Sequence, residues 1–382
     1  MPKSDTGRSD SAPSDTENAR RAAALLHHRS AALAPGESTA LPLTTSSTFH
    51  LPPDDPESFY YGRNDTPVWQ SVEHQLAILE EAPCLLFASG MAAISAALFA
   101  TLGQGKNLLI PADGYHATRR LAHDCLAAFG VSVRECRTRE LANATLDDTH
   151  VLFIETPCNP GLDVCDIGLI VERARQAGTI VIADNTASTP FLQRPLDRGV
   201  DIVVAADTKA PGGHSDVIAG HVASRNPVFI EGMKNWRSLG GAIAGPHQAW
   251  LLHRGLETLE LRLERMCGTA GKLARALSRH ERVHGLRYPG LPNDPSHATA
   301  ARQMSDFGTL ISFELEGRDA ANRFIERCSL LASATSFGGI HSSAERRARW
   351  GDNVAEGFIR LSVGCEPADV LIESIGDALN SM

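Results

Sequence analysis

The stretch IVVAADTKAPGGHSDVIAGHV, residues 202–222, decides the fold of this chain. Its first five residues are apolar and predict a buried parallel strand that ends at Asp207. A loop of small residues follows, carries the single lysine Lys209, and leads into a second apolar segment at Val217. Open α/β sheets bind their ligands at the carboxyl ends of the strands, so Lys209 stands where chemistry is expected.

Lys209 is flanked by Thr208 and Ala210, which offer little solvation to a charged amine. Partial burial disfavours the ammonium form and lowers the pKa of a lysine toward that of a nucleophilic amine. A lysine that forms a Schiff base needs this property. The alternative is an ordinary solvated loop lysine, and the rest of the chain has to decide between the two.

The composition is that of a soluble globular protein. Its 382 residues exceed what one core usually organises, so we expect a large domain and a smaller one. The net charge of -9 offers no basic face for nucleic acid, and no run of about eighteen apolar residues is present to span a membrane. We therefore expect neither nucleic acid nor a membrane among the partners.

The N-terminus and the cysteines indicate a cytoplasmic protein. Residues 1–20 are polar, lack the apolar segment of a secretory signal, and are predicted to be a disordered tail. The eight cysteines include no C-x-x-C pair and mostly lie beside apolar residues, which favours reduced core thiols over disulfides or metal ligation. His214 and Asp216 form a lone H-x-D pair, which is weak evidence for a metal, and we expect none.

Strands and helices alternate through the middle of the chain. Apolar segments typical of strands begin at residues 84, 107, 131, 151, 179 and 202, and helices are predicted between them over 89–102, 115–129 and 166–177. This alternation predicts an α/β fold with a mostly parallel sheet covered on both faces. Later strand candidates, at 309–315 and 358–363, predict a second, α+β domain.

The chain is accordingly divided into four parts. Residues 1–20 are the polar tail, 21–58 an N-terminal helix and an extended arm against a neighbouring subunit, 59–246 the large domain that binds the cofactor, and 247–382 a linker helix with the small domain. The first helix is predicted over Ala19–Ala32 and the linker helix over His247–Arg279.

Three strand ends carry polar groups that make sense together. Ser89-Gly90-Met91 opens a helix, where free N–H groups and the helix dipole favour a phosphate. Asn159 stands in a rigid turn after one strand, and Asp184 ends another. A buried carboxylate is costly unless it meets a cation or a donor. Taken singly, Ser89 could be an ordinary N-cap and Asn159 part of a structural turn.

Together these groups match the needs of pyridoxal phosphate (PLP). The cofactor presents a phosphate to a helix N-terminus, a pyridine nitrogen to an acid, and an aldehyde to a lysine. An anionic Asp184 keeps the ring nitrogen protonated, so that the ring withdraws electrons from the carbon attached to the imine. The residues therefore predict a PLP site around Lys209.

Ordered motifs strengthen this prediction. They are Tyr61-Gly62-Arg63, Ala88-Ser89-Gly90-Met91, Glu155-Thr156-Pro157-Cys158-Asn159-Pro160, Asp184-Asn185-Thr186, Thr208-Lys209 with Gly213-His214-Ser215-Asp216, Arg254-Gly255-Leu256-Glu257-Thr258-Leu259, and Ile359-Arg360-Leu361-Ser362-Val363-Gly364-Cys365-Glu366. In this order they resemble the Cys/Met-metabolism family of PLP enzymes, which holds cystathionine γ-synthase, cystathionine γ-lyase, cystathionine β-lyase and methionine γ-lyase. The resemblance runs from about Leu41 to the C-terminus.

The resemblance implies the PLP-dependent transferase fold type I and a role for each site residue. Lys209 would form the Schiff base, Asp184 would pair with the ring nitrogen, and Asn159 would bond the ring hydroxyl. Lys209 and Tyr115, which stacks on the ring and acts as acid or base, are the expected catalytic residues. The expected cofactor contacts are Lys209, Asp184, Asn159, Ser89, Gly90, Met91, Tyr115, Thr208, Thr186, Tyr61 and Arg63, and the expected substrate contacts are Arg360, Ser336 and Tyr61.

Two of these expectations concern partners. Arg360 would bind the α-carboxylate of an amino-acid substrate, a bidentate task that suits a guanidinium. Tyr61 and Arg63 would reach the phosphate of the neighbouring subunit's cofactor. The resemblance thus implies a homo-oligomer with active sites shared across a dimer, and usually a tetramer.

The chain also departs from the family at positions that bear on specificity. Ala206 replaces a serine that binds the phosphate, and a lost hydrogen bond to a charged group costs about 1.5 to 3 kcal/mol. His116-Ala117 follows Tyr115 in place of Gly-Gly or Gly-Cys, which makes methionine γ-lyase activity less expected. The segment 344–352, AERRARWGD, replaces the family's usual sequence near the distal end of the substrate.

The expected reaction is γ-elimination on a sulfur-containing or γ-substituted L-amino acid, like that of a cystathionine γ-lyase, giving cysteine, 2-oxobutyrate and ammonia. The alternatives are γ-replacement of the cystathionine γ-synthase or O-acylhomoserine sulfhydrylase type, and cystathionine β-lyase activity. A catalytically silent oligomeric scaffold is the alternative from another class.

Overall fold

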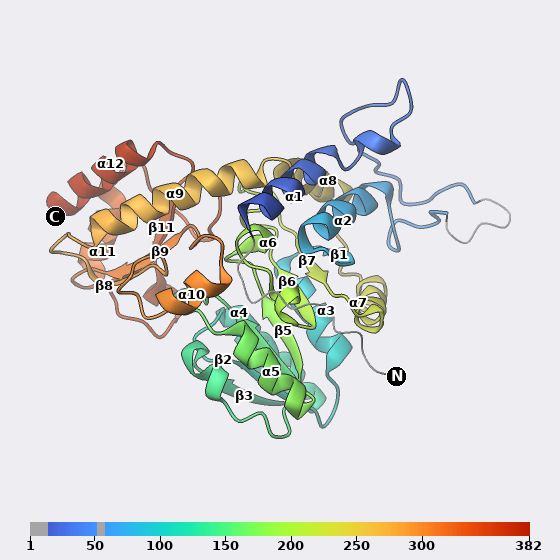
Figure 1. Ribbon diagram of the computed structural model, residues 1–382, viewed down its shortest axis with the longest axis horizontal. Helices are drawn as coiled ribbons and strands as arrows, with labels where there is room; N and C mark the ends of the chain where they lie inside the picture. The colour runs from blue at the N-terminus through green and yellow to red at the C-terminus, as the bar shows by residue number, and fades with distance from the viewer. Residues whose placement is uncertain (1–13, 52–57) are drawn as a thin grey trace.

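Two β-sheets organise the protein (Figure 1). The computed structural model describes residues 14–51 and 58–382, and the predictions for residues 1–13 and 52–57 lie outside this part. The larger sheet has the order β1-β7-β6-β5-β4-β2-β3, formed by β1 (Cys84–Phe87), β2 (Asn107–Pro111), β3 (Ser132–Cys136), β4 (Val151–Glu155), β5 (Ile180–Asp184), β6 (Ile202–Ala205) and β7 (Gly220–Ala223). Strands β2 to β6 pair in parallel, whereas β7 is antiparallel to β1 and β6. The predicted α/β fold with a mostly parallel sheet is confirmed.

Helices cover both faces of this sheet because residues of its inner strands alternate between two apolar cores. In β4, Leu152 and Ile154 belong to the same core as helix α5 (Ile167–Ala177), whereas Val151 and Phe153 belong to the same core as helix α3 (Gly90–Thr101). The helices of this part are α2 (Pro67–Glu80), α3 (Gly90–Thr101), α4 (His116–Arg120), α5 (Ile167–Ala177), α6 (Thr189–Leu192) and α7 (Pro227–Gly240). Among the described residues, no helix is both long and apolar enough to cross a membrane.

The second sheet lies in the C-terminal third of the chain. Its order is β10-β11-β12-β9-β8, formed by β8 (His284–Arg287), β9 (Leu310–Glu314), β10 (Ala332–Ser333), β11 (Ser343–Arg346) and β12 (Phe358–Ser362). The accompanying helices are α10 (His297–Gln303), α11 (Gly317–Arg327) and α12 (Ala368–Asn380). Phe313, Phe324 and Leu371 join β9, α11 and α12 in a separate core.

The prediction of a single linker helix over His247–Arg279 is wrong, because this segment forms two helices, α8 (Pro246–Leu256) and α9 (Leu259–Leu277). Arg262 explains the break. It donates to the carbonyls of Ala210 and Gly255, and the hydroxyl of Thr258 accepts from its Nε at 3.1 Å. The break therefore sets the start of α9 against the loop after Lys209, and α9 then runs on to the second sheet (Figure 1).

The first helix begins earlier than predicted. Helix α1 (Asp15–His27) starts inside the stretch 1–20 that the sequence predicts to be a disordered tail, and a separate 3-10 turn at Ser30–Ala32 replaces the end of the predicted helix Ala19–Ala32. The correction has a local cause. The hydroxyl of Ser14 accepts from the N–H of Glu17 while the Glu17 carboxylate accepts from the N–H of Ser14, so polar residues typical of a tail here form a capping box.

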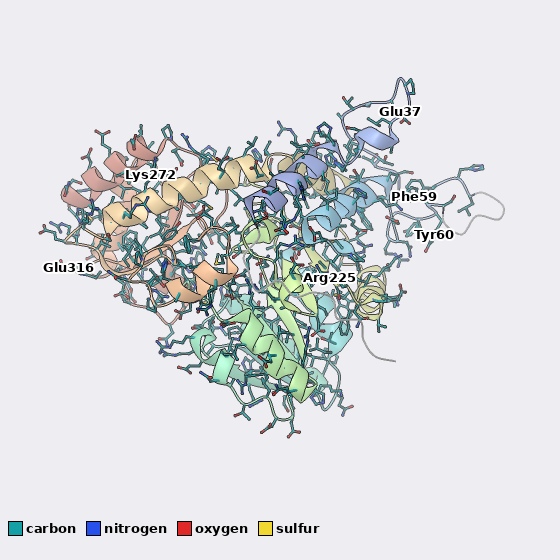
Figure 2. All side chains as sticks on the ribbon, viewed as in Figure 1. Glu37, Phe59, Tyr60, Arg225, Lys272 and Glu316 are labelled. Carbon is teal, nitrogen blue, oxygen red and sulfur yellow. The ribbon has the colours of Figure 1, made fainter. Side chains whose placement is uncertain are left out.

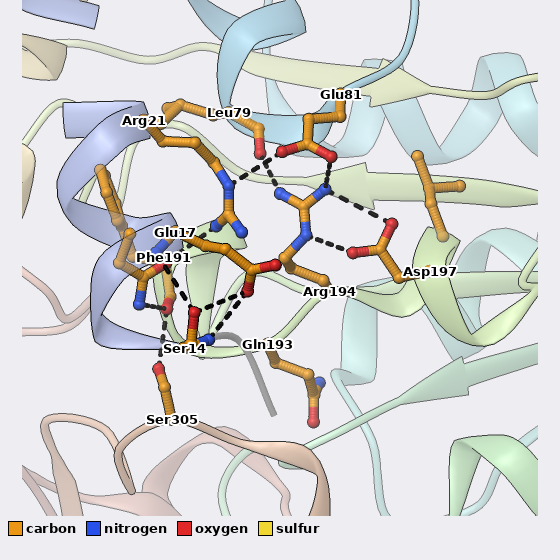
Figure 3. Close-up of polar contacts among 12 residues, drawn as sticks. Ser14, Glu17, Arg21, Leu79, Glu81, Phe191, Gln193, Arg194, Asp197 and Ser305 are labelled. Atoms are coloured by element: carbon orange, nitrogen blue, oxygen red, sulfur yellow. Dashed lines mark hydrogen bonds and ion pairs between the residues drawn. The ribbon is translucent and has the colours of Figure 1, made fainter. Parts of the chain in front are cut away.

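Helix α1 is tied to the part of the chain that carries the larger sheet by an ion network (Figure 3). Nε of Arg21 lies 3.1 Å from the carboxylate of Glu81, which also pairs with Arg194 at 2.8 Å. Arg194 continues to Asp197 and donates to the carbonyl of Leu79 at 2.8 Å. These contacts hold residues distant in sequence together.

A buried histidine joins the central strands to α2. His221 in β7 contacts Asp207 through Nδ1 at 2.8 Å and Glu80 through Nε2 at 3.3 Å. Burial alone would lower the pKa of His221, but the two acids outweigh it and raise the pKa to about 10. Folding thus favours the charged imidazole. Its contribution to stability is complete below pH 6.5 and is lost as the pH rises toward about 10.

We expect His221→Gln to lower the free energy of unfolding by about 3 to 5 kcal/mol below pH 6.5, because two buried acids lose their cation. The difference from the wild type should shrink as the pH rises, since the wild type then loses the same charge. Urea unfolding at several pH values measures it, with the exposed His284→Gln as the control. A difference independent of pH would contradict a charged His221.

Candidate active site

A cavity of about 480 Å³ lies where β4, β5 and β6 end. It brings together most of the predicted site residues, namely Ser89, Gly90, Met91, Tyr115, Asn159, Asp184, Thr186, Thr208, Lys209, Ser336 and Arg360. The last two come from the C-terminal part of the chain, so both parts contribute walls. Parallel strands end at one sheet edge, which is why motifs far apart in sequence meet there. The role of each residue toward a ligand remains a prediction.

The amine of Lys209 lies between the two parts. Nζ donates to the hydroxyl of Ser336 at 3.0 Å and lies 5.2 Å from the ring centre of Phe337. Burial and the charge of Arg360 lower the pKa of Lys209 to about 8, although Asp184 and Glu345 act in the opposite direction. The neutral amine, which a nucleophile or base requires, is then a minor form near neutral pH but a far more abundant one than in a solvated lysine. The alternative of a solvated loop lysine does not hold.

Asp184 is a buried acid that Thr186 holds in place. It is 7% exposed, and its Oδ1 accepts from the N–H of Thr186 at 2.9 Å. Burial raises the pKa of Asp184 despite these hydrogen bonds and the charge of Lys209. The hydroxyl of Thr186 in turn accepts from the N–H of Ala206 at 2.9 Å, which links the ends of β5 and β6. A carboxylate in this setting favours a cationic partner.

Helix α3 begins in close contact with the end of β6. Ser89 caps the helix and accepts from the N–H of Ala92 at 3.0 Å. A Cβ at Gly90 would lie 2.5 Å from the Cβ of Ala206, so only glycine permits this approach. The free N–H groups of the first turn and the helix dipole thus form a cradle for an anion in the cavity wall.

Glu155 is a site residue that sequence analysis missed. Its Oε2 accepts from the N–H of Tyr115 at 2.6 Å and its Oε1 from the N–H of Asn159 at 2.7 Å, so it fixes two loops of the cavity. Burial and the nearby Asp184 raise the pKa of Glu155 to about 8. Burial also raises the pKa of Tyr115. The sequence held one signal for Glu155, because it is a second acid, besides Asp184, at the end of an apolar strand. In the sheet the two residues are directly opposite one another on the adjacent strands β4 and β5.

Arg360 is buried and firmly held. Nη1 donates to Oδ1 of Asn159 at 2.6 Å, and Nη2 donates to the carbonyl of Ser336 at 2.6 Å and to Glu345. Within the described part of the chain, Nε of Arg360 is a buried donor without a partner. A fixed guanidinium with an unused N–H suits a carboxylate ligand. Ser336, which contacts both Lys209 and Arg360, has a φ of 78°, rare outside glycine.

Tyr61 and Arg63 are absent from the residues that line the cavity of their own chain. Arg63 donates to the carbonyl of Ser238 at 2.8 Å and lies over the ring of Tyr61. Tyr61 is exposed, and the adjacent Phe59 and Tyr60 stand out from the body of the protein in Figure 2. Their contact with a neighbouring subunit stays a prediction.

One cluster among the described residues has metal-ligand chemistry. The ligand atoms of Asp113, Cys158 and Asp163 lie within 4.8 Å of one another. Asp113 accepts from the N–H and the hydroxyl of Thr138, and Asp163 pairs with Arg287. Burial raises the pKa of the Cys158 thiol. These partners account for the cluster, and we assign no metal to it.

The side chains of the cavity fit PLP. They supply an amine with a lowered pKa at Lys209, a buried acid at Asp184, and the anion cradle that Gly90 forms against Ala206. A mostly parallel sheet covered on both faces, with this set at its edge and a small α+β part beside it, defines a PLP-dependent enzyme of fold type I.

Comparison of the sequence with known proteins leads to the same class of enzyme. The model of the family described as Cys/Met metabolism PLP-dependent enzyme matches residues 23–380, and the chain belongs to this family. A putative cystathionine gamma-lyase of Streptomyces coelicolor is 48% identical over 340 residues, 87% of this chain and 86% of the relative. A cystathionine beta-lyase of Bacillus subtilis is 36% identical over 359 residues, 90% of this chain and 92% of the relative.

Solved structures extend the agreement to the fold. A cystathionine gamma synthase from Xanthomonas oryzae pv. oryzae has a TM-score of 0.90 and 31% identity, covering 94% of this chain and 97% of that chain. The predicted family, fold type and cofactor are thereby confirmed, as is the prediction of an enzyme over a silent scaffold.

We expect Gly90→Ala to weaken PLP binding at least about tenfold, because the added methyl group would displace the start of α3 from Ala206 and disturb the anion cradle. Titration of the cofactor-free protein with PLP, followed by absorbance, measures the affinity. Gly103→Ala is the control, since nothing lies within 4 Å of its added Cβ. Equal PLP affinity in both variants would contradict the role of this helix start.

Proposed function

We propose that this enzyme catalyses γ-elimination on a sulfur-containing or γ-substituted L-amino acid, in the manner of a cystathionine γ-lyase, giving cysteine, 2-oxobutyrate and ammonia from cystathionine. The observation that carries the proposal is the meeting of Lys209, Tyr115 and Arg360 in one cavity with the PLP-binding groups. The 48% identity to a putative cystathionine gamma-lyase favours this reaction within the family.

Each of these side chains has a task in such a reaction. PLP, when bound, withdraws electrons from the carbon that carries the substrate amine. Arg360 would hold the α-carboxylate and so orient the amino acid. Lys209, whose pKa is lowered to about 8, would take the α-proton in its neutral form and carry protons to the neighbouring carbon atoms. Tyr115, whose pKa burial raises, stays protonated and would give its proton to the leaving sulfur.

Two other reactions are named among the similar proteins. The named relatives include a cystathionine beta-lyase and a cystathionine gamma synthase, so β-elimination and γ-replacement, including the O-acylhomoserine sulfhydrylase type, are the alternatives. The choice depends on whether water or a second thiol substrate reaches the reacting carbon.

Product analysis distinguishes the three. The purified enzyme with PLP is incubated with cystathionine, with O-acetylhomoserine or O-succinylhomoserine plus cysteine, and with homocysteine, and the products are identified by mass. We expect cysteine and 2-oxobutyrate from cystathionine. Pyruvate with homocysteine would favour the β-lyase, and net formation of cystathionine would favour the synthase.

We further propose a homo-oligomer in which Tyr61 and Arg63 complete the site of the partner subunit, with a tetramer as the expected assembly. Support comes from Arg63 and Tyr61, which contact one another outside their own cavity. The eight free cysteines support the expectation of a reducing, cytoplasmic environment.

Co-expression tests the shared site. We expect chains with Arg63→Ala and chains with Lys209→Ala, each nearly inactive alone, to give about a quarter of the wild-type activity together, because half of the dimers are mixed and one of their two sites is then intact. The control pairs Asp184→Asn with Lys209→Ala, which both alter the cavity of their own chain and should give no recovery. If co-expressed Arg63→Ala and Lys209→Ala chains were as inactive as this control, the proposal of a shared site would be contradicted.

A further inference from the structure

The segment 344–352, which departs from the family pattern, lies in the wall of the cavity. Strand β11 pairs antiparallel with β12, so that Glu345 stands directly opposite Arg360. A 3-10 turn, Arg347–Trp350, follows, and the side chains at both of its ends line the cavity. The predicted carboxylate-binding arginine and the atypical segment therefore form one unit.

Glu345 divides its carboxylate between two arginines. Its Oε1 accepts from Nη2 of Arg360 and also from Nη1 of Arg347, the latter at 2.8 Å. Its Oε2 accepts from the indole N–H of Trp350 at 2.9 Å. Arg347 continues to Asp352, with its Nε at 2.7 Å and its Nη2 at 2.6 Å from Oδ2. Charges of alternating sign thus run from Arg360 to Asp352.

The buried setting makes these charges sensitive to one another. Arg360 and Glu345 are each 3% exposed, and Arg347 is 4% exposed. Burial opposes the charged form of Glu345, but the two arginines outweigh it and lower the pKa of the carboxyl. An anionic Glu345 competes with a substrate carboxylate for Arg360. Arg347 limits this competition because it donates a hydrogen bond to the same oxygen of Glu345, Oε1.

We propose that Arg347 is a positioning residue for the substrate: by sharing Glu345, it leaves Arg360 the positive charge and the free Nε–H that bind the α-carboxylate of the amino acid. The inference rests on the proposed function, which takes Arg360 as the carboxylate site. Without Arg347, the Glu345 carboxylate interacts with Arg360 as its only arginine partner. The charge of Arg360 is then neutralised by Glu345 and attracts the substrate carboxylate less strongly. Without the charge of Asp352, Arg347 attracts Glu345 more strongly and frees Arg360 further.

The test compares two ligands that differ only in the carboxylate, L-norvaline and n-butylamine, titrated into the PLP-loaded enzyme and followed by the cofactor's absorbance. We expect Arg347→Gln to weaken norvaline binding about tenfold and to change butylamine binding less than about twofold. The KM of the amino-acid substrate should rise by about the same factor, with kcat within about twofold. Arg347→Lys keeps the charge and should recover part of the affinity.

Arg349→Gln is the matched control, because this exposed arginine lies in the same turn with its guanidinium over the ring of Trp350. Thermal unfolding checks that each variant folds. Equal losses for both ligands, or unchanged norvaline binding in Arg347→Gln, would overturn the inference alone. Should that variant not fold, Asp352→Asn decides, since tighter norvaline binding supports the inference and equal or weaker binding overturns it. A wild-type enzyme that binds neither ligand overturns the proposed function as well.

Discussion

Lys209→Ala is expected to abolish covalent attachment of PLP and to lower kcat by about a thousandfold or more. In the proposed reaction the amine of Lys209 would have two tasks, because it would bond the cofactor aldehyde at rest and move protons during turnover. Both depend on an amine that is partly neutral, and its pKa of about 8 results from burial and the charge of Arg360. Alanine supplies neither the bond nor the base, so the effects combine.

Reduction with borohydride followed by peptide mass mapping measures the attachment. The mass of reduced PLP should appear on the peptide of Lys209 in the wild type and on no peptide in the variant. Lys272→Ala, which removes an exposed lysine of α9 visible in Figure 2, is the control and should keep both attachment and activity. Attachment at another lysine of the wild type would contradict the assignment.

Local patterns in the sequence predicted much of the fold and the site. The apolar runs before Asp184 and Lys209 identify buried strands on their own, and parallel strands end at one edge, so the residues after them had to meet. The contact between Gly90 and Ala206 has the same origin, because helix α3, which follows β1, starts beside the end of β6.

The contacts that sequence analysis missed join segments whose register no local pattern reveals. Glu345 meets Arg360 only because β11 and β12 pair in one particular register, and a shift by one residue would turn the carboxylate to the other face of the sheet. The break between α8 and α9 depends likewise on Arg262 and on carbonyls of the distant lysine loop. The helical periodicity of the sequence continues across this break, so the pattern of apolar residues does not reveal it.

Asp184→Asn is expected to lower kcat by about 100- to 1000-fold while PLP remains covalently bound to Lys209. Asparagine keeps the shape of the side chain and removes its charge. If Asp184 is the partner of the ring nitrogen, as we propose, the ring would lose the charge that keeps this nitrogen protonated and would withdraw electrons less strongly. The two variants thus separate attachment of the cofactor from its activation, which steady-state kinetics and mass mapping measure together.

A conservative series sharpens this distinction. Asp184→Glu keeps the charge but displaces it, and it should retain more activity than Asp184→Asn, because charge matters here more than shape. Asp377→Asn, an exposed acid of α12, is the matched control and should behave as the wild type. Full activity of Asp184→Asn would mean that the buried acid serves only the hydrogen bonds to Thr186, and the ring nitrogen would then need another partner in the cavity.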